Sequence, residues 1–138
     1  MERGLRITAL DPDEDYLGIE VVASNERFAG SAWIHAGVEE LSDLAARMDG
    51  FPRSCDDRGT HELGNRDPAF AGGFVSITVR CLDRAGHLAV HLVLEDDAGR
   101  YPRAHAAFGF QTEPAALDHF IESLRKVERD RSGSASLP

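Results

Sequence analysis

The chain has 138 residues, of which 42% are hydrophobic and 28% are charged. This composition excludes a wholly disordered protein, because a chain of this size and apolar content can bury one hydrophobic core. Its 15 basic and 24 acidic side chains leave a formal net charge of −9, which disfavours a nucleic-acid partner, because such binding depends on neutralising phosphates.

Alternating apolar residues predict three strands in the first half of the chain. The first covers residues 6–10 and leads into an acidic turn at residues 11–15. The second places Leu17, Ile19 and Val21 on one face. The third covers residues 27–36, with Phe28, Ala32 and Ile34 on one face and Arg27, Ser31, Trp33 and His35 on the other.

A helix-like spacing follows Gly37, where one stripe contains Val38, Leu41, Leu44, Ala45 and Met48. Gly50 and Pro52 predict the end of this helix. The next segment, residues 49–73, is too long for an ordinary connection. We expect it to be functional, to be disordered or to contain a short edge strand, for which residues 61–65 are the candidate.

The second half repeats this order with stronger signals. Two runs, residues 74–82 and 88–95, predict a hairpin whose inward residues are Val75, Ile77, Val79, Cys81, Leu88, Val90, Leu92 and Leu94. A return strand at residues 101–110 points Ala106, Phe108 and Phe110 inward. Thr112 is then the expected N-cap of a second helix, whose stripe is Leu117, Phe120, Ile121, Leu124 and Val127.

These patterns predict one α+β domain over residues 1–129, with a disordered tail at residues 130–138. We expect a mainly antiparallel sheet of about five to seven strands with both amphipathic helices on one face. Each half contains a strand, a turn, a strand and a helix, which indicates a duplicated strand-strand-helix unit. The alternative is that any two such segments look alike at this level of detail.

The outward strand face is the candidate partner-binding surface. If the alternation is correct, the side opposite the helices carries Trp33, His35, Arg80, His91 and His105. Tryptophan and arginine are among the residue types most enriched at interface hot spots. The alternative is that Trp33 is a core residue and the strand register is shifted by one, which would exchange the two faces.

An alternative site lies in the long loop, where Asp56, Asp57 and His61 are suitable residue types for a metal site or a nucleophile-base pair. Their spacing matches no known metal or hydrolase signature, so ordinary loop polarity is the competing interpretation. We therefore predict no catalytic residues, no metal and no cofactor. The two cysteines, Cys55 and Cys81, form no C-x-x-C motif and indicate no disulfide framework.

No segment approaches the roughly twenty apolar residues of a membrane helix, and residues 1–9 lack the apolar run of a signal peptide. We therefore expect a cytoplasmic protein without membrane contact. The acidic charge suits a basic protein partner, because complementary fields speed encounter and help exclude wrong partners.

Two groups of packing residues carry a family resemblance. The first is a Phe-x-Gly strand at Phe28, a Trp-Ile pair at Trp33 and a Val-Glu-Glu-Leu-x-x-Leu helix at Val38. The second is the Phe-Val-Ser-Ile-Thr-Val strand, the Phe-Gly-Phe strand and the Pro-Ala-Ala-Leu-Asp-x-Phe helix. Both resemble small uncharacterised bacterial α+β proteins, some of which look like immunity proteins of polymorphic toxin systems.

This resemblance implies a protein partner. It assigns no catalytic role to any residue of this chain. Together with the charge, it favours a protein-binding module, such as an immunity-type inhibitor of a basic toxin or nuclease, over an enzyme. The alternative is a small enzyme or a small-ligand-binding protein with a site near residues 49–73. A homodimer formed by exposed strands is compatible with either function.

Overall fold

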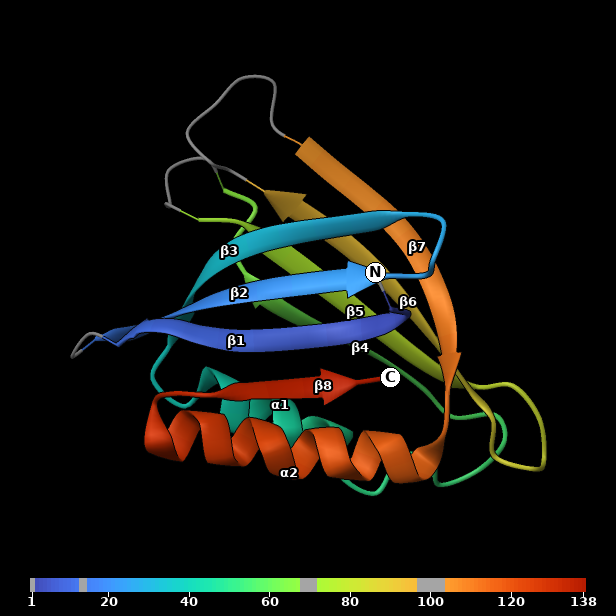
Figure 1. The fold of residues 1–138 in the computed structure, drawn as a ribbon. Helices are drawn as coiled ribbons and strands as arrows, with labels where there is room; N and C mark the ends of the chain where they lie inside the picture. Colours follow the sequence, from blue (N-terminus) through green and yellow to red (C-terminus); the bar gives the residue numbers. More distant parts are fainter. Residues whose placement is uncertain (1, 13–14, 68–71, 97–103) are drawn as a thin grey trace.

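A computed structural model describes residues 2–12, 15–67, 72–96 and 104–138 of the protein. Within these ranges the chain forms eight strands and two helices (Figure 1). Their order is β1 (Gly4–Pro12), β2 (Tyr16–Ser24), β3 (Ala29–Gly37), α1 (Glu40–Met48), β4 (Arg58–Gly64), β5 (Phe74–Cys81), β6 (Leu88–Asp96), β7 (Ala104–Thr112), α2 (Pro114–Asp130) and β8 (Ser134–Leu137). The predicted α+β class, with antiparallel strands and two amphipathic helices, is confirmed.

The strands divide into two antiparallel sheets of four, where we expected one sheet. Sheet A has the order β3-β2-β1-β8 and sheet B has the order β4-β5-β6-β7. In Figure 1, sheet A lies in front of sheet B, and both helices lie below β8. Two sheets suit this sequence because each has one apolar face, and the two faces cover each other.

The two sheets meet at β3, which contacts every strand of sheet B. At the opposite edge of sheet A, α2 packs against β8 and against α1, and α1 in turn contacts β3 and β4. The helices therefore close the side of the core that the two sheets leave open. No described helix has both the length and the apolar character that a membrane crossing requires.

The predicted sorting of side chains into buried and exposed sets holds along most of the chain. All the inward residues of the 74–82 and 88–95 hairpin are buried, as are the predicted stripe of α2 and four of the five residues predicted for α1. Two expected core residues are exposed: Phe28 at 66% and Val38 at 61%. Phe28 lies in a turn closed by the Asn25 carboxamide, and Val38 precedes the first residue of α1.

The same order of elements occurs twice, as β1-β2-β3-α1-β4 and as β5-β6-β7-α2-β8. The last strand of each copy joins the sheet of the other copy, because β4 pairs with β5 and β8 pairs with β1. The strand-strand-helix unit expected from the sequence is thus contained in a longer repeated arrangement. The edge strand suspected at residues 61–65 is β4.

The chain end differs from the prediction, because residues 134–137 form β8 where we expected a disordered tail. Ala135 and Leu137 are each 1% exposed and lie opposite Ile7 and Leu5 of β1. Only two apolar residues alternate in this polar segment, which is too weak a signal to predict a strand. Thr112 is also not the N-cap of α2: Glu113 occupies that position, and the Thr112 hydroxyl bonds to the carbonyl of Pro138.

Candidate partner-binding site

The five residues predicted for partner binding are divided between two sheets. Trp33 and His35 lie on the outer face of sheet A, whereas Arg80, His91 and His105 belong to β5, β6 and β7 of sheet B. The side chain of Trp33 is exposed, at 45%, so the alternative of a register shifted by one is wrong. The five residues therefore occupy outward positions, as expected, but on different faces of the molecule.

Three rings on the outer face of sheet A form the aromatic patch: Tyr16, Trp33 and His35. The His35 ring lies between the other two, with centroids 4.8 Å from Tyr16 in an edge-to-face arrangement and 5.0 Å from Trp33. Gly18 lies opposite His35 in the strand register. Because Gly18 has no side chain, the Tyr16 ring has room to reach across to His35.

The backbone of Trp33 is held at the edge of sheet A. Its carbonyl accepts a 2.7 Å hydrogen bond from the N–H of Gly73, and its own N–H donates to the Asp96 carboxylate at 3.3 Å. A side chain at position 73 would collide with the carbonyl oxygen of Glu95, so this close approach requires glycine. The patch is consequently presented on a fixed strand.

Acidic groups border the aromatic patch. Glu20 is exposed and lies opposite Trp33 in the register of β2 and β3, and Asp96 approaches from sheet B. The buried Nδ1 atom of His35 has no hydrogen-bond partner within the described part of the chain. The arrangement is an aromatic surface with carboxylates at its rim.

Sequence reasoning missed Tyr16, which directly follows the acidic run that we read as a turn. It also left out Arg58, the exposed first residue of β4, since that residue lies in the segment predicted as a long loop. A period-two signal was available at β4, where His61 and Leu63 are buried and alternate with exposed Thr60 and Glu62. Extending this alternation backward would have placed Arg58 on an outward position.

The loop residues predicted as an alternative site are in different environments. The Asp57 carboxylate accepts hydrogen bonds from the backbone N–H groups of Arg53 and Arg58, so it closes a turn, and Asp56 is exposed. His61 is buried at 8% exposure, and burial is the main cause of its lowered pKa, with a smaller contribution from the Arg47 cation. In the described residues, no group of three or more metal-ligand types is suitably placed to hold a metal ion.

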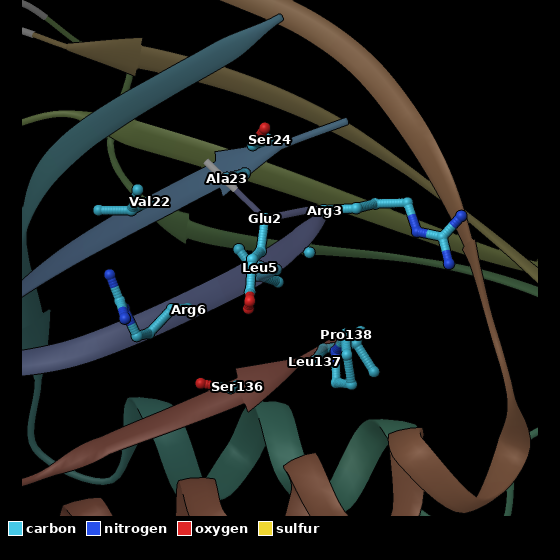
Figure 2. Close-up of a pocket in the computed structure, with 11 residues that line it drawn as sticks. Glu2, Arg3, Leu5, Arg6, Val22, Ala23, Ser24, Ser136, Leu137 and Pro138 are labelled. Atoms are coloured by element: carbon cyan, nitrogen blue, oxygen red, sulfur yellow. The ribbon is translucent and has the colours of Figure 1, made fainter. Parts of the chain in front are cut away.

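A hollow of about 370 Å³ lies where the two chain ends approach each other, and Figure 2 shows its lining residues. It contains two cations, Arg3 and Arg6, whose side chains point in opposite directions (Figure 2). The two guanidinium groups therefore do not converge on one point in this hollow. Comparison with protein-family models, with curated proteins and with solved structures finds no match to the chain.

Proposed function

We propose that the protein is a protein-binding module whose contact surface is the aromatic patch, and that it acts as an immunity-type inhibitor of a basic toxin or nuclease. The observation that carries this proposal is Trp33: the chain has a single tryptophan, and it is 45% exposed on a sheet face rather than packed in the core. A large aromatic side chain gains much free energy when a partner removes it from water.

The rigidity of the patch supports the proposal. Ring contacts with His35 limit the orientations of Tyr16 and Trp33, and two hydrogen bonds hold the Trp33 backbone. Ordering a side chain at an interface costs about 0.5–1.5 kcal/mol, and a side chain that is already ordered avoids part of that cost. More of the burial energy is then available for affinity.

The negative charge of the protein favours a basic protein as its partner. The protein has a net charge of −9, and carboxylates of Glu20 and Asp96 lie beside the patch. A basic protein surface would gain attraction at the rim of such an interface and would associate faster at low salt. A nuclease or toxin that binds anionic substrates has a surface of this kind.

The test measures binding to the product of the gene adjacent to that of this protein, by isothermal titration calorimetry with the full chain. We expect a specific complex in which Trp33→Ala weakens the Kd by at least about tenfold, the scale of a hot-spot residue. Phe28→Ala is the matched control, because Phe28 is a more exposed aromatic residue outside the patch. This control variant should bind as tightly as the unmodified protein.

Two results would overturn the proposal. One is that the adjacent gene product fails to bind at low salt. The other is a complex that tolerates Trp33→Ala as well as it tolerates Phe28→Ala, which would place the interface elsewhere. Circular dichroism of each variant establishes that the fold is intact before binding is compared.

A further inference from the structure

The outer face of sheet B carries two rows of side chains that run across all four of its strands. The first row consists of Arg58, Arg80, Ala89 and Gln111, which lie opposite one another in register. The second row, two residues along each strand, consists of Thr60, Thr78, His91 and Gly109. The small residues Ala89 and Gly109 leave space over β6 and β7.

That space is a hollow of about 490 Å³, within the range of small-molecule sites. Its polar lining converges from four strands and consists of Arg58, Thr78, Arg80, His91 and Gln111. The Thr78 hydroxyl is held by a 3.0 Å hydrogen bond to the Thr60 hydroxyl. Gly109 is required at the floor, because a Cβ atom there would lie 2.7 Å from the carbonyl oxygen of Val90.

Arg58 and Arg80 form a like-charge pair at directly opposed positions. Like charges opposite each other on neighbouring strands destabilise a sheet. Within the described residues, neither guanidinium group makes a salt bridge, although the chain has 24 acidic side chains. The carboxylate of neighbouring Asp57 accepts hydrogen bonds from backbone N–H groups and forms no salt bridge with either guanidinium group.

Some other arginines of the described chain do form ion pairs with carboxylates. Arg66 contacts Glu95 at 3.1 Å, and Arg125 contacts both Asp49 and Glu122. Arg58 and Arg80 have no carboxylate partner among the described residues, and their opposed positions bring two guanidinium groups to the same hollow. A bound anion would remove the repulsion between them and would accept hydrogen bonds from both guanidinium groups.

We propose that this hollow binds a small phosphate monoester, with the phosphoryl group between Arg58 and Arg80 and the organic group over Ala89 and Gly109. Two guanidinium groups, a hydroxyl and an amide supply more donors than one carboxylate accepts, whereas a phosphoryl group presents three strongly accepting oxygens. The volume exceeds the need of a phosphate ion alone. This site is on the other sheet from the aromatic patch, so it is independent of the proposed protein interface.

The experiment is a titration of the ¹⁵N-labelled protein followed by NMR, at constant ionic strength, with phenyl phosphate as the probe. Benzoate is the matched carboxylate, and chloride controls for simple screening. We expect saturable shifts of backbone amides in residues 78–80, 89–91 and 109–111, with a Kd at or below about 1 mM and weaker binding of benzoate. Arg80→Gln should weaken binding by about tenfold or more, the scale of a lost charge-assisted hydrogen bond.

Two further variants separate shape from charge. Ala89→Leu keeps both arginines but fills the hollow, so it should prevent binding. Arg27→Gln removes an exposed arginine from a turn outside the hollow, and it should leave the Kd unchanged. The proposal is overturned by an absence of saturable shifts with phenyl phosphate, by benzoate binding equally tightly, or by an equal loss in Arg27→Gln and Arg80→Gln. Dispersed spectra of each variant show that it is folded.

Discussion

The hydroxyl of Thr112 donates a 2.6 Å hydrogen bond to the carbonyl oxygen of Pro138. Thr112 is the last residue of β7 in sheet B, and Pro138 directly follows β8 in sheet A. This bond therefore joins the end of β7 in sheet B to the residue that follows β8 in sheet A. It adds to the pairing of the short β8 strand with β1 and to its packing against α2.

The first prediction concerns the stability that β8 provides. Leu137 is 1% exposed, so Leu137→Ala should lower the free energy of unfolding by about 2–4 kcal/mol through lost burial and a cavity. Thr112→Val should cost about 1 kcal/mol, since it removes the hydrogen bond to Pro138. Urea unfolding measures both. Exposed Ser136→Ala is the control, and a loss in that variant equal to that in Leu137→Ala would contradict this account of β8.

The second prediction concerns pH. Burial, helped by the Arg47 cation, lowers the pKa of His61 below its ordinary value of 6.5. The unfolded chain therefore binds a proton at pH values where folded His61 does not, and the free energy of unfolding should fall on acidification from pH 7 through the ordinary pKa. The slope contributed by one such group is at most about 1.4 kcal/mol per pH unit.

Urea titrations across this pH range should show a smaller slope in His61→Gln. His87 is a control of opposite sign, because its hydrogen bond to Asp83 raises the pKa of His87 and so favours the folded state on acidification. Stability in His87→Gln should therefore fall more steeply as the pH is lowered. Identical slopes in the unmodified protein and His61→Gln would show that His61 is not the group responsible.

The third prediction compares two glycines with nearly the same backbone conformation. Gly50 has a φ of +77° and Gly64 a φ of +81°. Alanine at either position should therefore destabilise the folded state by about 1–2 kcal/mol, because a residue with a Cβ atom is strained in the left-handed conformation. A Cβ at Gly50 meets nothing within 4 Å, whereas at Gly64 it would collide with the carbonyl oxygen of Gly73. Gly64→Ala should therefore lower the thermal midpoint clearly more than Gly50→Ala does. Equal decreases of the thermal midpoint in the two variants would show that a Cβ at position 64 does not collide with the Gly73 carbonyl oxygen.

The fourth prediction concerns Trp33, whose fluorescence reports on the patch because the chain has no other tryptophan. With 45% of the residue exposed, acrylamide should quench the emission of the folded protein strongly. Tyr16→Ala should increase quenching further if the ring cluster shields one side of the indole through His35. A blue-shifted emission that resists acrylamide would show that Trp33 is buried.

Much of this fold follows from local alternation. Ile77 and Thr78, neighbours on β5, point to opposite sides, and the sequence pattern alone assigned each to the correct side. On α2 the pattern likewise assigned Leu117 to the buried stripe. Strand and helix geometry decide which face a residue occupies within a few residues of chain, so a local pattern is sufficient to predict it.

The local pattern does not predict which strands pair with one another. β8 joins β1 from the far end of the chain, and this choice depends on a free strand edge and an unfilled part of the core, neither of which is visible in residues 130–138. The division into two sheets separated Trp33 from Arg80, which alternation had placed on one face. The register between β4 and β5 brought Arg58 opposite Arg80. For most strands and helices the sequence by itself determined which side of the element each side chain occupies, because that is a local property. Only the tertiary structure decided which exposed side chains share a surface, because hydrogen bonding between distant strands sets their neighbours.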